Sequence, residues 1–425
     1  MNITRVHARR VWDSRGCPTI EVEVHCGGVM GRVIAAAGKS IGAKERPEQR
    51  DGGTAHGGMD VRKGVDLTNA LVASRLVGMP VEAQAEIDAL LLDEEGMGAQ
   101  LGTNVTTAVS LAVLAAASAA RDVPLWASGE QHPARLPVPE IQIFGGGQHA
   151  GRALEVQDFM VCSPSAGSFS EALDRAAEVF RAAGGLLQRR GLQRGLADEG
   201  GYWPALGSNE AVLDLLVEAI LAGGLVPGED VWISLDIAAS SFGRPERYPM
   251  GGQVHDTDDF VGLLSGWLEK YPILCVEDPF HEDDDAGFER LSARWGGHVQ
   301  IIGDDFLASR PDRIRRAGQS NSCNSVIVKP WQAGSVSRTL EALDTASDSG
   351  LATILSGRSG DSEDVTVAQL AVGWDVGQIK VGGIARSERC AKWNELLRIE
   401  EAIGSDAAFA GAEMLARFKR GSPVQ

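Results

Sequence analysis

Short β-rich runs alternate with longer amphipathic segments in this chain, and this alternation constrains its fold more than any other feature. Six runs in the second half each end on a polar or charged residue, namely Asp236, Glu277, Asp304, Lys329, Ser356 and Lys380. Helices are predicted before, between and after them, over residues 168–189, 209–222, 256–270, 336–349, 362–372 and 387–401. Such a pattern is typical of a parallel sheet or barrel, in which the carboxyl ends of the strands meet at one mouth.

Three of these strand ends carry a carboxylate. Asp236, Glu277 and Asp304 would meet at the mouth, where three anions repel one another unless a cation lies between them. Oxygen ligands without His or Cys suit a hard cation such as Mg²⁺. A single acid after a strand is usually a helix cap or a solvated turn. Three acids, with Lys329 and Lys380 facing them from later strands, instead predict a metal site.

The first third of the chain has a different organisation. Ile3–Asp13, Thr19–His25 and Met30–Ala36 are β-rich, and residues 105–120 have the composition of a buried helix. Residues 37–60 are rich in Gly and charged residues without an apolar period, which predicts a long loop that acts as a lid. The proline-rich residues 136–139 mark a boundary, so two domains are predicted, 1–135 and 136–425.

Composition narrows the choice of partner and compartment. The 425 residues are 44% hydrophobic, as in a soluble protein with a sizeable core. A net charge of −18 argues against nucleic acid and anionic membranes as partners, but not against a small anionic substrate. Six cysteines without CxxC spacing indicate free thiols in a reducing cytosol. The first ten residues lack the apolar core of a signal peptide, so a cytoplasmic protein is expected.

Several motifs in this sequence resemble one family along essentially the whole chain. They include SLDIAASSF, VEDPFHEDD, VIVKPWQAGS, LSGRSGDSED and GQIKVGG in the second half, and VHARRVWDSRGCPTIEVEV and ADEGG before them. The chain is similar to the enolases, the phosphopyruvate hydratases. This resemblance implies an α/β fold, with an enolase-type (β/α)8 barrel and an N-terminal α+β capping domain. It also implies that the early barrel strands are not all parallel and that the protein is a homodimer.

The resemblance also implies roles for individual residues. Asp236, Glu277 and Asp304 match the ligands of a first Mg²⁺, and Ser40 matches the lid serine that binds a second, substrate-dependent Mg²⁺. Lys329 matches the base that removes the proton next to the substrate carboxylate, and the family serves as a standard case of such a base working with Mg²⁺. Lys380 matches the family's lysine that neutralises the substrate carboxylate, and Glu199 matches the acid that assists the departing group. Arg358 and Ser359 match the residues that bind the phosphate, here called the phosphate clamp. Gln157 and His149 match neighbours of the site.

The sequence departs from the enolase pattern on the side of the leaving group and in the lid. The family's active-site histidine before the phosphate arginine is Gly357 here, and the family's second glutamate near the leaving group is the shorter Asp158. Lys39 adds a cation to the lid segment next to Ser40. The base, the metal ligands and the phosphate clamp are intact. The pattern therefore predicts working enolisation chemistry in a roomier and more cationic leaving-group pocket.

Three functions follow from these observations. The first is a Mg²⁺-dependent lyase or synthase that acts on a modified phospho- or phosphono-carboxylate, similar to the carboxyphosphonoenolpyruvate synthases of phosphonate natural-product pathways. The second is an ordinary enolase, which converts 2-phosphoglycerate to phosphoenolpyruvate. The third is a binding protein that uses an enolase shell without catalysis, against which the intact Lys329, Glu199 and Asp304 argue.

Overall fold

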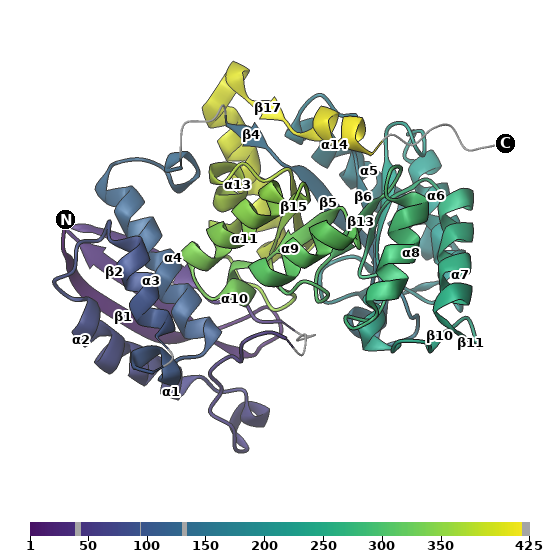
Figure 1. The fold of residues 1–425 in the computed structure, drawn as a ribbon. Coiled ribbons are helices and arrows are strands. Elements are labelled where there is room, and N and C mark those ends of the chain that lie inside the picture. Colours follow the sequence, from purple (N-terminus) through teal and green to yellow (C-terminus); the bar gives the residue numbers. More distant parts are fainter. Residues whose placement is uncertain (39–43, 94, 130–133, 419–425) are drawn as a thin grey trace.

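The chain folds into two parts, an N-terminal α+β domain and a barrel, which lie side by side in Figure 1. The computed structural model describes residues 1–38, 44–93, 95–129 and 134–418. The barrel follows the smaller domain in the chain and carries most of the helices.

The N-terminal domain is a three-stranded antiparallel sheet covered by helices. Its strands β1 (Ile3–Trp12), β2 (Pro18–Cys26) and β3 (Val29–Ile34) pair in that order. Helix α4 (Thr103–Ala120) packs against β2 and β3, and the shorter helices are α1 (Arg62–Leu67), α2 (Ala73–Leu76) and α3 (Gln84–Leu92). Among the described helices, α4 alone has the length and hydropathy of a membrane span, but 78% of it is buried inside the protein. It is therefore the core helix of this domain.

Eight strands form the barrel, and their hydrogen bonding closes it. The order is β5 (Val138–Gly145), β6 (Asp158–Cys162), β9 (Trp232–Asp236), β12 (Ile273–Glu277), β13 (Gln300–Gly303), β14 (Ser325–Val328), β15 (Ala352–Ser356) and β16 (Gln378–Gly383), and β16 pairs back with β5. Strand β6 is antiparallel to both of its neighbours, and the other neighbouring strands are parallel. The enolase-type barrel with unusual early strands is thus confirmed.

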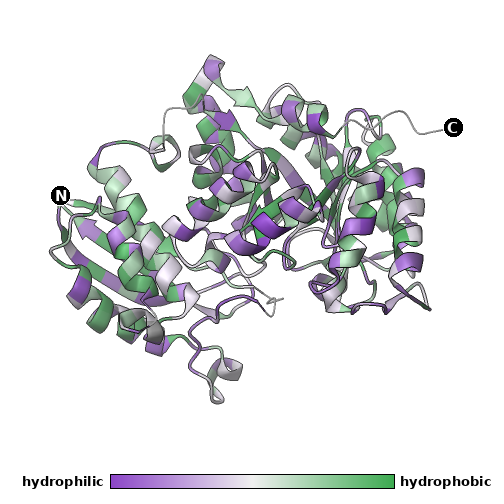
Figure 2. Ribbon diagram, in the orientation of Figure 1, coloured by the Kyte–Doolittle hydropathy of each residue, from purple (hydrophilic) through white to green (hydrophobic). Residues whose placement is uncertain are grey.

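Helices surround this barrel, and Figure 2 shows hydrophobic residues along the strands and mixed residues on the helices. The longer helices are α5 (Phe169–Arg190), α6 (Asn209–Ala222), α7 (Thr257–Lys270), α8 (Asp285–Trp295), α9 (Pro311–Ser320), α11 (Val336–Asp348), α12 (Thr366–Gly373) and α13 (Ser387–Ile403). The smaller elements are α10 (Pro330–Ala333), α14 (Gly411–Arg417), β4 (Arg135–Leu136), β7 (Gln193–Leu196), β8 (Tyr202–Pro204), β10 (Tyr248–Met250), β11 (Gln253–His255) and β17 (Ala408–Phe409). Local sequence explains where several helices begin, because Ser168, Ser208, Asp256, Asp284 and Ser335 each cap a helix by accepting a backbone N–H.

The six strands and six helices predicted in the second half are present, with ends that differ by a few residues. Two barrel strands, β5 and β6, two of the longer helices, α8 and α9, and the smaller elements of this half were not predicted. Strand β5 was missed because its second residue is Pro139, and prolines at 137 and 139 suggested a boundary rather than a strand. The division of the chain at residues 135 and 136 stays a prediction.

Backbone contacts hold the N-terminal domain over the mouth of the barrel. Ala37, just after β3, exchanges two hydrogen bonds of 2.8 Å with Gly360, which follows β15. Ser14 N–H also donates to the carbonyl of Asp361 at 2.7 Å. The segment predicted as a lid therefore starts beside the loop that carries Arg358. Of that segment, residues 39–43 lie outside the described residues, and the rest contains only a short turn of helix at Ala55–Gly58.

Candidate active site

A cavity at the mouth of the barrel collects most of the side chains that the sequence singled out. From that set it is lined by His149, Gln157, Glu199, Asp236, Asp304, Lys329, Gly357, Arg358, Ser359 and Lys380. Gly38, Ser356, Val381 and Arg389 complete its walls. Glu277 and Asp158 lie directly behind these residues, because Glu277 contacts Lys380 and Asp158 contacts His149. Lys39 and Ser40 fall outside the described residues.

The three carboxylates at the strand ends are close to two ammonium groups. Lys380 Nζ lies 2.8 Å from Asp236 Oδ2 and 2.6 Å from Glu277 Oε2, and Lys329 Nζ donates to Asp304 Oδ2. Glu277 Oε1 and Asp304 Oδ1 are buried and have no hydrogen-bond partner among the described residues. Buried carboxylate oxygens without a partner are costly. Oxygen donors of this kind fit Mg²⁺, which binds such ligands preferentially.

Burial and neighbouring charges shift the pKa values of Glu277, Asp304 and Lys329. Burial raises the pKa of Glu277 well above its usual range, and the nearby Asp236 adds to the effect. Burial would also raise the pKa of Asp304, but the ammonium groups of Lys329 and Lys380 hold it below its usual value. Burial would lower the pKa of Lys329, yet Asp304 outweighs it and raises that pKa. A cation bound between the carboxylates would offset the repulsion between Glu277 and Asp236. It would also weaken the attraction by which Asp304 raises the pKa of Lys329. Both shifts therefore fit a metal site.

Asp278 is a buried residue of this site that the sequence did not single out. Its two oxygens accept the backbone N–H groups of Asp304 and Asp305, each at 2.8 Å. Asp278 directly follows Glu277. One short segment therefore supplies the Glu277 carboxylate and also binds the backbone at Asp304, the carboxylate of the next strand end. The repeated acidic pairs, Glu277-Asp278 and Asp304-Asp305, were the available signal in the sequence.

Replacing Asp278 with asparagine is expected to weaken Mg²⁺ binding by about 10- to 100-fold, the usual effect of losing a residue that orients a metal ligand. An amide has one acceptor oxygen, so one of the two backbone N–H groups would lose its partner. Isothermal titration with Mg²⁺ measures the affinity, and the exposed Asp283→Asn serves as the matched control. An affinity equal to that of the unaltered protein would show that Asp278 does not orient Asp304.

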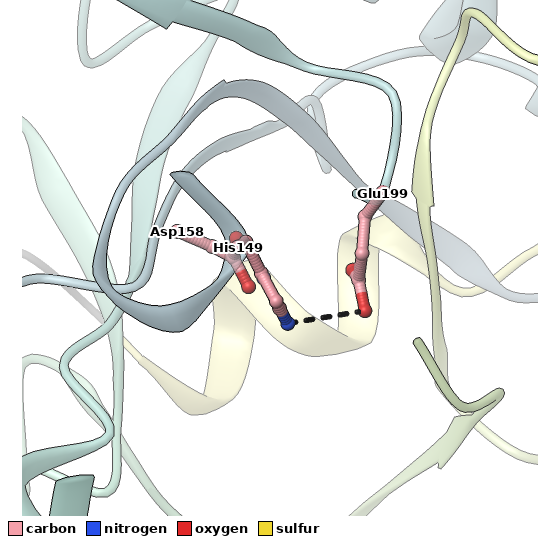
Figure 3. Close-up of side chains that lie close together, drawn as sticks. All are labelled: His149, Asp158 and Glu199. Atoms are coloured by element: carbon pink, nitrogen blue, oxygen red, sulfur yellow. Dashed lines mark hydrogen bonds and ion pairs between the residues drawn. The ribbon is translucent and has the colours of Figure 1, made fainter. Parts of the chain in front are cut away.

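His149, which also lines the cavity, lies between two carboxylates, as Figure 3 shows. His149 Nδ1 is 2.9 Å from Asp158 Oδ1, and His149 Nε2 is 3.8 Å from Glu199 Oε1. Asp158 begins β6, His149 follows β5, and Glu199 lies in the loop between β7 and β8. That loop turns tightly at Gly200, where φ is +99° and a Cβ atom would lie 2.4 Å from the carbonyl of Ala385. Tertiary packing thus joins three separate segments here.

The predicted phosphate clamp is packed against the loop of the N-terminal domain. Arg358 donates to Glu45 Oε2 at 2.9 Å, and Glu45 Oε1 accepts from Gln332 at 3.0 Å. Gly38 allows this approach, because a Cβ atom there would lie 1.9 Å from the Arg358 guanidinium. Arg389 in α13 donates to the backbone carbonyls of Arg358 and Ser359 and so fixes the backbone of these two residues. Glu45 and Arg389 were not identified from the sequence, because only the fold brings them to Arg358.

Gly357 faces the cavity at the position where the enolase pattern has histidine. A Cβ atom at Gly357 would lie 3.4 Å from Asp361 Oδ2 and 3.5 Å from Val381 Cγ1, which are ordinary contact distances. A side chain could therefore begin at this position without displacing the backbone.

Comparisons with known proteins agree with this geometry. The family model described as "Enolase, N-terminal domain" matches residues 3–128, and the one described as "Enolase, C-terminal TIM barrel domain" matches residues 133–418. A protein named enolase from Acidothermus cellulolyticus is 40% identical over 424 residues, which is 99% of each chain. This name favours the second of the three functions, the ordinary enolase reaction, over the modified-substrate interpretation.

Proposed function

Because the chain belongs to the enolase family, we propose that it is a Mg²⁺-dependent lyase that converts 2-phosphoglycerate to phosphoenolpyruvate. The observation that carries this proposal is the convergence in one cavity of Lys329, the buried Lys380, two of the three strand-end carboxylates and the guanidinium of Arg358. The groups that the reaction needs are a base, cations for a carboxylate and a phosphate, and a proton donor for the departing hydroxyl.

Each group has a place in this reaction. Lys329 removes the α-proton, Lys380 neutralises the substrate carboxylate, and Arg358 binds the phosphate through its planar fork of N–H donors, with Ser359 beside it. Gln157 donates to Asp236 Oδ2 at 3.4 Å and so supports that carboxylate. Glu199 lies at the wall where the hydroxyl departs.

Asp236, Glu277 and Asp304 would hold the first Mg²⁺, and Ser40 with the bound substrate would hold the second. The ions supply positive charge that stabilises the substrate carboxylate as the α-proton leaves. The buried oxygens of Glu277 and Asp304 without hydrogen-bond partners support this assignment.

A direct assay tests the proposal. We expect the protein to convert 2-phosphoglycerate with a kcat/KM of about 10⁴ M⁻¹s⁻¹ or more, the range of ordinary efficient enzymes. Phosphoenolpyruvate formation is measured directly by its ultraviolet absorbance. Absence of product at any Mg²⁺ concentration would refute the proposal.

A second candidate function rests on Gly357. The missing side chain leaves space beside Arg358, and Lys39 adds positive charge to the lid, so a substrate with a larger and more anionic substituent would fit. On this proposal the chain acts on a phosphono-carboxylate, as in carboxyphosphonoenolpyruvate synthesis. Asp158 is one methylene shorter than the family's glutamate, which also supports a larger substituent on the substrate.

Gly357→His separates the two candidates. If the chain is an ordinary enolase, we expect the new imidazole to leave kcat/KM for 2-phosphoglycerate unchanged or to lower it. If the chain acts on a larger substrate, turnover of 2-phosphoglycerate should be slow in the unaltered protein and at least about tenfold faster in the variant. Gly357→Ala, which the contact distances allow, is the control for an effect of the added Cβ alone.

We also propose a homodimer in the cytoplasm, without nucleic-acid or membrane partners. The family expectation supports the dimer, and six unpaired cysteines support a reducing compartment. The net charge of −18 disfavours polyanionic partners.

A further inference from the structure

We infer that Glu140 is a positioning residue of the active site, because its carboxyl group bridges strands β9 and β16 inside the barrel and so fixes Asp236 against Lys380. Glu140 is fully buried in β5 and is not among the residues that line the cavity. The inference rests on the proposed function for the roles of Asp236 and Lys380. It deepens that function by adding a residue that acts through both of them.

The carboxyl group of Glu140 is an exception in its surroundings. The interior of a barrel is usually filled by bulky apolar side chains, and a buried acid is costly unless hydrogen bonds replace its contacts with water. Glu140 has such bonds. Ser234 Oγ lies 2.5 Å from Glu140 Oε2, and Gln378 Nε2 donates to Glu140 Oε1 at 3.1 Å. Since apolar groups of similar volume often replace buried polar ones without loss of stability, this acid indicates a role beyond packing.

The bridge formed by Ser234, Glu140 and Gln378 joins strands that do not pair with each other in the sheet. Strand β9 pairs with β6 and β12, and β16 pairs with β15 and β5. Because β6 lies between β5 and β9, Glu140 reaches Ser234 through the interior of the barrel. Gln378 extends the network to β13, where it exchanges hydrogen bonds of 2.5 and 2.9 Å with Gln300.

This bridge lies one layer below the mouth of the barrel. Alternate residues of a strand point to the same face, so Ser234 lies below Asp236 and Gln378 lies below Lys380. Glu140 is itself the register partner of Lys380 in the pairing of β5 with β16. A fixed separation in the lower layer therefore fixes the two strand ends above it, where Asp236 Oδ2 and Lys380 Nζ are 2.8 Å apart.

The direct contact between Asp236 and Lys380 is not available throughout the proposed reaction. Asp236 would bind Mg²⁺, and Lys380 would bind the substrate carboxylate. The bridge remains, because none of its three residues belongs to the proposed metal or substrate site. It can therefore keep the two side chains at the separation that the reaction needs, as residues behind a functional site commonly do.

Hydrogen bonding, and not charge, is the property of Glu140 that the bridge uses. Burial raises the pKa of Glu140 above its usual value, although Ser234 and Lys380 oppose this effect. Glutamine has nearly the same shape and keeps both contacts, since its NH₂ group donates to the hydroxyl of Ser234 and its oxygen accepts from Gln378. Methionine keeps neither contact.

A small set of variants separates a positioning role from packing. Glu140→Gln keeps the bridge, whereas Glu140→Met combined with Ser234→Ala replaces it with apolar groups. Ser234→Ala alone removes only the contact with β9 and is the milder variant, to be used if the double variant does not fold. Asp88→Asn is the matched control, because Asp88 is also buried but bonds to Ser110 and Ser337 in and beside the N-terminal domain.

The first measurement needs neither metal nor substrate. In protein with ¹⁵N-labelled lysine and EDTA, the ammonium resonance absent from Lys380→Met identifies Lys380, and its hydrogen exchange reports how firmly Asp236 and its neighbours hold it. We expect exchange to be about tenfold faster in the double variant, as for the loss of a hydrogen bond of ordinary net strength, and faster to a smaller extent in Ser234→Ala. Glu140→Gln and Asp88→Asn should leave the exchange rate unchanged.

The second measurement compares function with stability. In the double variant we expect kcat/KM for 2-phosphoglycerate to fall by about 10- to 100-fold, the usual effect of losing a residue that orients functional groups, with a Tm close to that of the unaltered protein. Glu140→Gln should retain activity, and Asp88→Asn should lower Tm without this loss of kcat/KM.

Three results would overturn the inference. The first is an unchanged ammonium exchange rate in the double variant, or in Ser234→Ala if the double variant does not fold. The second is a loss in Glu140→Gln as large as in the double variant, which would assign the effect to the charge of Glu140. The third is an equal loss in Asp88→Asn, which would assign it to stability alone. Failure of the proposed function would instead appear as absent turnover of 2-phosphoglycerate in the unaltered protein, and the ammonium exchange would still decide the role of Glu140.

Discussion

Lys329→Ala is expected to abolish α-proton exchange, with a rate at least about 10⁴-fold below that of the unaltered protein, at the upper end of what a positioned base contributes. The ammonium of Lys329 lies at the end of β14, faces the cavity and has Asp304 as its partner. Alanine removes the proposed base and leaves the carboxylates in place. Exchange is followed by NMR in deuterium oxide with 2-phosphoglycerate.

Mg²⁺ affinity should stay the same or increase in this variant, because Asp304 no longer shares its charge with Lys329. Lys270→Ala, at an exposed lysine on α7, is the control for the loss of a surface charge. Exchange that persists in Lys329→Ala would mean that another group is the base.

Glu277→Gln is expected to produce the second large effect, a loss of Mg²⁺ affinity of at least about 100-fold together with loss of turnover. The substitution keeps the shape of the side chain but removes one anionic oxygen from a site whose other proposed ligands are Asp236 and Asp304. Titration calorimetry measures the affinity. In the unaltered protein, EDTA should abolish turnover and added Mg²⁺ should restore it. Turnover that survives in EDTA would contradict metal-assisted chemistry.

Thermal unfolding gives an independent readout of the same variant. Since burial and Asp236 raise the pKa of Glu277, its ionised form is unfavourable in the folded state without a cation. Stability contributed by this group therefore increases as pH falls through its folded pKa. Without metal, Glu277→Gln should be at least as stable as the unaltered protein. With Mg²⁺, only the unaltered protein should gain a higher Tm. An equal Tm gain in both would show that Mg²⁺ binds elsewhere.

Much of the architecture was predictable from local pattern. The runs that end at Asp236, Glu277 and Lys329 are short and apolar, and each is followed by helical periodicity, so strands β9, β12 and β14 were identified within one residue. Strands β5 and β6 were not, because Pro139 broke the pattern and β6 is antiparallel to its neighbours, which no local signal encodes. Strand direction is decided by which neighbours a strand packs against.

The sequence by itself determined which residue types stand at the ends of the barrel strands, and hence that carboxylates and lysines would meet at one mouth. It also determined the family, through motifs spread over both domains. Periodicity and chain order are sufficient for this, because parallel strands in a barrel all present their carboxyl ends to the same side.

Only the tertiary structure decided how those residues pair. It placed Lys380 against Asp236 and Glu277, Glu45 against Arg358, and Asp278 behind the backbone of Asp304. It also placed His149 between Asp158 and Glu199, so that the imidazole and not Asp158 faces the cavity. The physical reason is that these contacts depend on side-chain distances between segments far apart in the chain. Burial then amplifies each charge interaction, and neither distance nor burial is written in the order of the residues.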